Sequence, residues 1–326
     1  MKKVLKWLAI LLGVVFVALV GFISYIKIAL PNVGDAPDLK VEITPERVAR
    51  GKYLAHSVNV CMDCHSARDW EHFSGPMIPS TLGQGGEIFD QKLGFPGKFV
   101  ARNITPFALA AWTDGEIYRA ITAGVSKDGG PLFPVMPHHR YGKMANEDIY
   151  SLIAYLRSIP AIESHPDESS PDFPMSVILH TIPAKGIPAE KVPALSDTLA
   201  YGAYLFNAAA CGECHTPQDK GAPIAGLELA GGFEFPMPNG IVVRSMNITP
   251  DKTTGIGNWS RAQFIQRFKM YADTSYKAPK IEQGGFATIM PWMMYSSMTE
   301  QDLSAIFTYM KTLKPIKHEV VRWNKL

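Results

Sequence analysis

The pattern Cys-x-x-Cys-His occurs twice in this chain of 326 residues, at residues 61–65 and again at residues 211–215. Two cysteines three positions apart lie on one face of a helical turn, so both thiols can reach the same flat ligand. Haem is attached covalently at this pattern, through thioethers to the vinyl groups of the porphyrin. The histidine that follows offers a ring nitrogen to the iron. The sequence therefore predicts two haem-attachment segments.

Three other uses of such cysteine pairs can be weighed against haem. A zinc ribbon would place the two pairs a few tens of residues apart, whereas the pairs here lie in opposite halves of the chain. A redox-active dithiol would require a βαβ context, which the sequence lacks. Two short disulfide loops would not require a histidine after each pair. The four cysteines are all used by the two patterns, which favours haem: Cys61, Cys64, Cys211 and Cys214.

The N-terminus has the pattern of a membrane segment. Lys2, Lys3 and Lys6 precede an uncharged apolar run from residue 7 to residue 26. As a helix, this run covers about 30 Å, the thickness of a bilayer core. A cleaved signal peptide, the alternative, has an apolar core of about 7–15 residues and a small-x-small cleavage site. We therefore expect an uncleaved anchor in the cytoplasmic membrane, with the rest of the chain on the periplasmic side because the lysines stay inside.

After residue 195 the sequence repeats the features that follow residue 44. The word Asn-Ile-Thr-Pro occurs at residues 103–106 and 247–250, and Met-Pro occurs at residues 136–137 and 290–291. Such a repeat predicts an internal duplication. We assign residues 1–30 to the anchor or signal, 31–44 to a linker, 45–162 and 196–316 to two domains, 163–195 to a proline-rich linker, and 317–326 to a tail.

Helix signals predict an all-α fold for both repeats, behind the N-terminal transmembrane helix. Thr44 followed by Pro45 starts the first helix, and Thr113, Asn146 and Thr299 are expected to cap later ones. The first and last helices of each repeat should cross. The glycines expected to allow the close approach, and the residues expected opposite them, are Gly51 with Tyr155 and Leu156, and Gly202 with Tyr309 and Met310.

Each repeat also offers a methionine as a sixth ligand for its iron. Met136 and Met290 both precede a proline, which favours an extended backbone along a haem face. A thioether ligand favours ferrous iron and so raises the reduction potential. The chain has 14 methionines, and a methionine is more often a core residue than a metal ligand. The matched positions of Met136 and Met290 in the two repeats favour binding to iron.

Several assignments near these ligands stay open at this stage. His138 or His139 could bind iron in place of Met136, and Met144 and Met298 also occupy matching positions. The repeated Asn-Ile-Thr-Pro words are expected to form turns. A second hypothesis for Asn103 is a hydrogen bond to a haem propionate.

Together these motifs resemble the multihaem c-type cytochrome subunits of membrane-bound periplasmic dehydrogenases that oxidise alcohols, aldehydes or sugar acids. The resemblance covers residues 45–160 and 196–315 and implies two tandem class I cytochrome c domains. Those subunits commonly have three haem domains, whereas this chain has two. The resemblance implies two covalently attached haem c groups, with these axial iron ligands: His65, Met136, His215 and Met290.

The expected function is electron transfer, one electron at a time, with a redox protein partner: a dehydrogenase subunit, a quinone-linked complex or an oxidase. A net charge of +2 gives no indication of nucleic-acid binding. We assign no catalytic residue. The alternative is a dihaem cytochrome c peroxidase, which has two such patterns but needs one iron with an open sixth position. The Met-Pro pair in both repeats disfavours that alternative.

Overall fold

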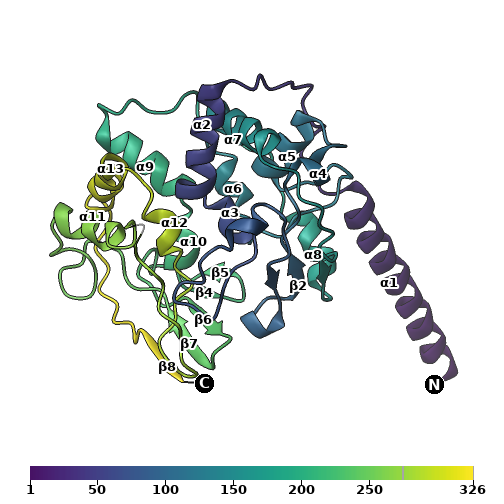
Figure 1. Cartoon of the computed structure of the whole chain (residues 1–326). Coiled ribbons are helices and arrows are strands. Elements are labelled where there is room, and N and C mark those ends of the chain that lie inside the picture. The colour runs from purple at the N-terminus through teal and green to yellow at the C-terminus, as the bar shows by residue number, and fades with distance from the viewer. Residues whose placement is uncertain (274, 326) are drawn as a thin grey trace.

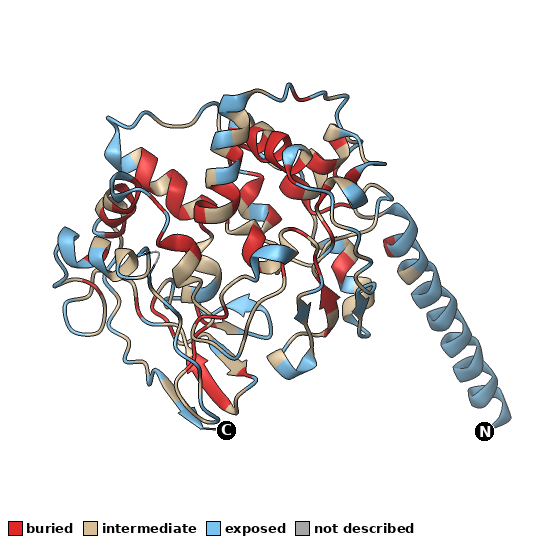
Figure 2. Ribbon diagram, viewed as in Figure 1, coloured by how far each residue is buried: buried red, intermediate tan, exposed pale blue. Residues whose placement is uncertain are grey.

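Two pairs of crossing helices lie at the centre of the structure, a computed structural model that describes residues 1–273 and 275–325 (Figure 1). Helix α2 (Pro45–Tyr53) packs against α7 (Asn146–Ser158), and α9 (Thr198–Ala208) packs against α13 (Glu300–Met310). The buried faces of these four helices contribute to one hydrophobic core (Figure 2). We refer to residues 45–162 as the first half and to residues 196–316 as the second half.

Apart from the N-terminal helix, which is described below, the other helical segments lie in the stretches of chain between these four helices. They are α3 (Cys61–Cys64), α4 (Pro106–Leu109), α5 (Asp114–Ala123), α6 (His138–Tyr141), α8 (Met175–Ile178), α10 (Cys211–His215), α11 (Arg261–Lys269) and α12 (Trp292–Tyr295). A π-helical turn, η1 (Leu54–Val58), extends α2, and three 3₁₀ turns are η2 (Pro79–Thr81), η3 (Gln91–Leu93) and η4 (Leu179–Thr181).

Most of the expected helix starts are confirmed. The side chains of Thr44, Thr113 and Thr299 each accept a backbone N–H of the first helical turn. The expectation for Asn146 is wrong, because α7 begins at this residue without a side-chain cap. Its amide oxygen instead accepts a hydrogen bond from the Tyr118 hydroxyl, at 2.8 Å.

Two glycines allow the helix pairs to cross closely, as expected. A Cβ atom added to Gly51 would lie 1.8 Å from the carbonyl oxygen of Ser151, and one added to Gly202 would lie 2.0 Å from that of Ala305. Both contacts are with backbone, which cannot move aside without displacing the partner helix. The crossing points lie about one helical turn earlier in α7 and α13 than the residues expected opposite the glycines, although Tyr155 Cβ also faces Gly51.

A reciprocal pair of tyrosine contacts joins the two halves. The Tyr53 hydroxyl in α2 donates to the carboxylate of Asp302 in α13, and the Tyr204 hydroxyl in α9 donates to Asp148 in α7, at 2.7 Å. Each tyrosine oxygen also accepts the backbone N–H of the N-cap residue of the helix it contacts. The start of the last helix of each half is therefore held by the first helix of the other half.

Three small antiparallel sheets make the fold mixed, so the all-α prediction is wrong in this respect. They are β1 (Ile88–Phe89), β2 (Gly97–Val100) and β3 (Ser170–Pro171); β4 (Gln218–Asp219) and β5 (Ala222–Pro223); and β6 (Glu234–Met237), β7 (Ile241–Arg244) and β8 (Trp323–Lys325). Strands of two to four residues are too short to show an alternating pattern. β3 belongs to the expected linker and β8 to the expected tail, where Trp323 pairs with Val243.

Helix α1 (Lys2–Ala29) projects from the body and is exposed along almost all of its 28 residues (Figures 1 and 2). It is long and apolar enough to cross a membrane. A signal sequence near the N-terminus can also form a helix this long and apolar, so these properties alone do not separate an anchor from a leader.

The close crossings predict a large effect of a single methyl group. Gly51→Ala and Gly202→Ala should each lower the free energy of unfolding by about 3 kcal/mol, because the added Cβ meets backbone. Gly130→Ala is the matched control, since its Cβ would lie 3.4 Å from the nearest side-chain atom. Denaturant titration of the three variants measures the difference, and equal stabilities would contradict the crossing geometry.

The tyrosine contacts predict that the two halves stabilise each other. Tyr53→Phe and Tyr204→Phe should each lower the free energy of unfolding by about 1–3 kcal/mol, because each leaves a buried carboxylate short of one donor. Tyr150→Phe is the control, since Tyr150 in α7 contacts Arg47 and Tyr118 through its ring, which phenylalanine retains. If the control loses as much stability as the two variants, the tyrosine hydroxyls do not hold the halves together.

Candidate haem-binding sites

Each haem-attachment segment begins with the same unusual backbone conformation. Val60, before α3, has a φ of +47°, and Ala210, before α10, has a φ of +51°. The left-handed region is unfavourable for both residue types, and most of all for a β-branched side chain such as valine. Neither residue type signals this conformation in a sequence, so it was not predicted. Its presence before both segments indicates that it sets the direction in which the cysteines enter the site.

The four cysteines are free thiols in the structure, so the disulfide alternative is not formed. Desolvation by the surrounding protein raises the pKa of the Cys61, Cys64 and Cys211 thiols to about 12, which keeps them neutral at ordinary pH. Cys214 is exposed. A zinc site would gather several such groups. Within residues 1–273 and 275–325, no three histidine, cysteine or acidic side chains meet in that way.

The histidine of each pattern is oriented by one backbone hydrogen bond. His65 Nδ1 lies 2.7 Å from the carbonyl oxygen of Arg102, and His215 Nδ1 lies 2.7 Å from that of Met246. A carbonyl can only accept, so the proton is on Nδ1 and the lone pair is on Nε2. Burial lowers the pKa of both histidines against the opposing effect of this bond. A neutral imidazole with a free Nε2 is the form that binds iron.

The first Asn-Ile-Thr-Pro word positions the carbonyl that His65 uses. Asn103 directly follows Arg102, and its side-chain oxygen accepts the backbone N–H and the hydroxyl of Thr105. Its Nδ2 donates to the carbonyl oxygens of Ile162 and residue 164. Both amide hydrogens are therefore used within the protein. The word is a turn that anchors the chain after α7, and the propionate hypothesis for Asn103 is not supported.

The second word is built in the same way. Asn247 follows Met246, its oxygen accepts the backbone N–H and hydroxyl of Thr249, and its Nδ2 donates to the carbonyl of Ile316 and the hydroxyl of Thr254. The residue before each word therefore supplies the acceptor for the histidine. Sequence reasoning missed this role, although the repetition of the word was the available signal.

A glycine beside each histidine lets the acceptor segment approach. The N–H of Gly85 donates to the carbonyl of His65, and that of Gly231 donates to the carbonyl of residue 215, at 2.9 and 2.8 Å. Both glycines have a φ near +75°, and a Cβ on either would lie 2.5 Å from the carbonyl carbon of Arg102 or Met246. Only glycine both adopts this positive φ without strain and leaves room for the neighbouring backbone.

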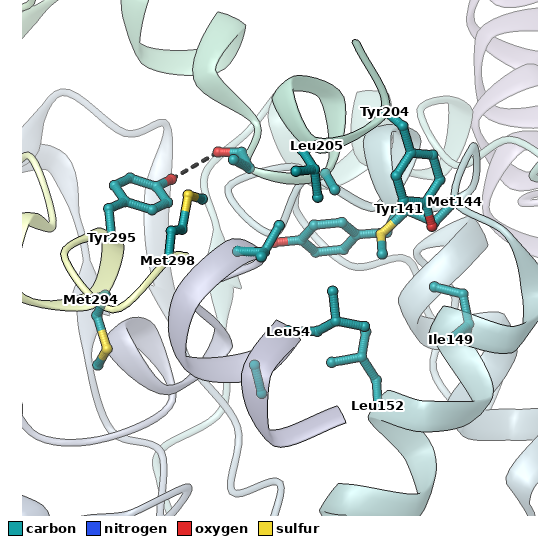
Figure 3. Close-up of a cluster of buried hydrophobic side chains, with 14 of the residues drawn as sticks. Leu54, Tyr141, Met144, Ile149, Leu152, Tyr204, Leu205, Met294, Tyr295 and Met298 are labelled. Carbon is teal, nitrogen blue, oxygen red and sulfur yellow. Dashed lines mark hydrogen bonds between the residues drawn. The ribbon is translucent and has the colours of Figure 1, made fainter. Parts of the chain in front are cut away.

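A tyrosine brings each Met-Pro loop to the haem-attachment segment of its own half. Tyr141 in α6 donates to the carbonyl of Asn59, and Tyr295 in α12 donates to that of Ala209, a bond marked in Figure 3. Asn59 and Ala209 both lie just before the first cysteine of their pattern. Together with Cys61 and Cys211, the methionines that begin the loops, Met136 and Met290, are half-buried against the core.

The matched pair Met144 and Met298 is explained by packing. Their exposures are 0% and 2%, and both lie among the side chains of the central core (Figure 3). The Met144 sulfur accepts a hydrogen bond from Asn59 Nδ2, at 3.1 Å. These two methionines are core residues.

The two histidines beside Met136 differ in their surroundings. His139 Nε2 contacts Glu213 Oε1 at 3.0 Å, which directs it toward the second half. His138 is buried against Gly124, and among the described residues neither of its ring nitrogens has a hydrogen-bond partner. Burial lowers its pKa to about 4. The position that matches His138 in the second half is Trp292, which cannot bind iron, whereas Met136 has a matching methionine.

The donor set in each half fits a covalently bound haem. Two thiols are available for thioethers. A neutral imidazole donates its Nδ1 proton to a backbone carbonyl, which leaves Nε2 free. A half-buried methionine begins a loop that is hydrogen-bonded to the same segment.

Comparison with known proteins agrees with this chemistry. Residues 199–314 match the family model of cytochrome c. The cytochrome c subunit of a quinone alcohol dehydrogenase from Gluconacetobacter polyoxogenes is 27% identical over 293 residues, which are 82% of this chain and 56% of that protein. The gluconate 2-dehydrogenase cytochrome c subunit of Pantoea cypripedii is 26% identical over 281 residues, 82% of this chain and 59% of that protein.

A shorter relative is covered almost completely. A diheme cytochrome c-type protein from Cereibacter sphaeroides is 26% identical over 290 residues, which are 86% of this chain and 90% of that protein. The chain spans a little more than half the length of the two dehydrogenase subunits. The resemblance indicated by the motifs is confirmed: residues 199–314 match the cytochrome c model, and more than four fifths of the chain is similar to cytochrome c subunits of dehydrogenases and to a diheme cytochrome c.

Proposed function

We propose that this chain is a membrane-anchored dihaem cytochrome c that transfers electrons one at a time between a periplasmic dehydrogenase or quinone and a downstream acceptor. The observation that carries the proposal is the matched pair of histidine hydrogen bonds, from His65 to Arg102 and from His215 to Met246. Two imidazoles that are oriented alike behind two cysteine pairs support two haem groups. The chain itself is an electron carrier rather than a catalyst.

Each proposed centre uses residues of one half. The thioethers are formed by Cys61 and Cys64 in the first half and by Cys211 and Cys214 in the second. The axial ligands are His65 with Met136 and His215 with Met290. When bound, haem supplies reversible one-electron chemistry, and a methionine ligand holds its potential high. The protein orients the imidazole, keeps the thiols available for attachment, and presents the thioether sulfur.

The proposed domains are residues 45–162 and residues 196–316. The repeated sequence words support this division, as do the two matching helix pairs, α2 with α7 and α9 with α13. The segment 163–195 connects the domains as an ordered strap that contributes β3 and α8.

The proposed location is the periplasmic face of the cytoplasmic membrane. The length of α1 and the lysines before it support an uncleaved anchor with the N-terminus inside. The proposed electron donor is a dehydrogenase, because the relatives above are cytochrome subunits of alcohol and gluconate dehydrogenases. The acceptor would be a quinone-linked complex or an oxidase.

Peroxidase chemistry fits less well. It requires one iron whose sixth position is open or easily vacated, so that peroxide can bind. The Met-Pro loops start matching short helices, α6 and α12, and both are bonded by a tyrosine to the haem-attachment segment. Nothing distinguishes one half as the open one.

Exchanging the methionines tests the axial ligands. Met136→His and Met290→His should each convert one centre to bis-histidine ligation and lower its midpoint potential, leaving the other unchanged. Met144→Leu and Met298→Leu are matched controls, because they exchange core methionines at similar volume. Spectroelectrochemical titration measures both potentials. If His138→Leu, and not Met136→His, alters the first centre, His138 is the ligand instead.

The proposed function is tested on the purified full-length chain. We expect a reductive titration to show two one-electron steps, two low-spin haems in both oxidation states, and no consumption of added peroxide. Isolation from washed membranes should recover the chain together with a dehydrogenase. A high-spin haem that turns over peroxide would establish the enzyme alternative, and release of the chain by washing would establish that α1 is a leader.

A further inference from the structure

One carboxylate of the second haem-attachment segment is bound by the first half. Glu213 lies between the two cysteines of α10, and its Oε1 receives Arg140 Nε at 2.6 Å and His139 Nε2 at 3.0 Å. Both basic residues lie in α6, directly after Met136 and its proline. Asn207 of α9 adds a third contact, through its Nδ2 to the Arg140 carbonyl at 3.0 Å. The loop that begins with Met136 is therefore tied to the half opposite.

The backbone of the second segment leaves room for this ion pair. A Cβ added to Gly212 would lie 3.2 Å from Arg140 Nη2, so the guanidinium lies directly over the glycine. The Arg140 and Glu213 side chains keep 33% and 26% of their surface exposed. At this exposure, the ion pair is better shielded from solvent and salt than a fully exposed surface pair. It also avoids the full desolvation cost of a completely buried pair.

The loop of the second half is held from the first half in turn. Ser74, in the segment that follows the first attachment pattern, donates its hydroxyl to the Met290 carbonyl at 2.6 Å. The hydroxyl oxygen of Ser74 also accepts the backbone N–H of Trp292, at 3.2 Å. These two bonds lie on either side of Pro291, and Ser74 is buried. A hydroxyl from one half thus fixes the backbone around the proposed ligand of the other.

Only one of the two contacts is ionic. The residue at the position of Glu213 in the first pattern is Asp63, and its carboxylate pairs with Arg68 of the same half, at 2.9 Å. The residue at the position of Arg140 in the second loop is Met294, and it lines a small cavity together with Asp63. A charge change at Glu213 should therefore reach the opposite loop directly. Arg68 also donates to the carbonyl oxygen of Ser74, at 2.7 Å, so a change at Asp63 would disturb the Ser74 contact as well.

We propose that Arg140 and Ser74 are positioning residues that hold each Met-Pro loop from the opposite half, so that the sixth ligand of each haem depends on the half that binds the other haem. This inference rests on the proposed function, because it takes Met136 and Met290 as the ligands. An untethered loop loses conformational freedom when its sulfur binds iron, and a loop that is already held loses less. Each contact should therefore strengthen an iron–sulfur bond by holding the backbone of the loop that carries the methionine.

The experiment uses the full-length protein with both haems, in two parent variants that report on one centre each. In Met290→His only the first centre retains methionine, and in Met136→His only the second does. The methionine-to-ferric-iron absorption band identifies that centre. Imidazole titration of the ferric protein then gives the concentration that displaces half of the methionine.

In the Met290→His parent, Glu213→Gln and Arg140→Met should each lower this imidazole concentration about three- to tenfold, the range expected of a partly shielded ion pair. The pair of changes together should do no more than either alone. Arg140→Lys keeps the positive charge, so it should need nearly the same imidazole concentration as the parent. This variant controls for loss of folding on substitution at residue 140. In the Met136→His parent, Ser74→Ala should weaken the second centre. Ser126→Ala is the control and should leave it within twofold of the parent, because Ser126 is equally buried but its hydroxyl accepts the N–H of Gly130 in its own turn.

Two results would overturn the inference alone. One is an imidazole affinity within twofold of the parent for both Glu213→Gln and Arg140→Met, with the methionine band intact. The other is a Ser126→Ala protein whose second centre weakens as much as that of Ser74→Ala, which would indicate general loosening. Absence of the methionine band from the Met290→His parent itself would instead overturn the ligand assignment, and this inference with it.

Discussion

The hydrogen bond from each of His65 and His215 to a backbone carbonyl is the interaction on which the rest of both proposed sites depends. It selects the tautomer and aims Nε2, but it needs a carbonyl at a fixed place beside the histidine. The Asn-Ile-Thr-Pro turn holds that carbonyl and ties the chain beyond the last helix to the same point. Gly85 and Gly231 allow the two segments to touch. The repeated words, glycines and histidines thus form one local unit in each half.

The interface between the halves is built by the same elements that form the sites. The first helix of each half caps the last helix of the other through Tyr53 and Tyr204. Contacts from Glu213 and Ser74 reach the opposite Met-Pro loop. Because α6 and α12 touch both their own attachment segment and the other half, changes at one proposed haem site have a direct structural route to the other. Two proposed haem sites fixed in this way differ from sites on two domains that are merely tethered.

Much of the helical framework could be predicted because its signals are local. A threonine cap followed by a helix, or a glycine at a helix crossing, depends on residues within one or two turns. The failures have equally physical causes. Asn146 was expected to cap α7, but Tyr118 binds its side chain. The strands were not predicted, because β1 and β3 have only two residues each. β3 and β8 also form only by pairing with strands that are distant in the sequence, β2 and β7.

The sequence by itself was enough to predict the chemistry: two cysteine pairs, each with a histidine, and a methionine at a matching place in each repeat. Haem attachment depends on residue type and short spacing, and the methionines were indicated by their matching places in the two repeats. Only the tertiary structure decided which carbonyl orients each histidine, that Met144 and Met298 belong to the core, and that Arg140 meets Glu213 rather than solvent. Those outcomes depend on residues far apart in the chain, and a linear pattern carries no distance between them until the helices have packed.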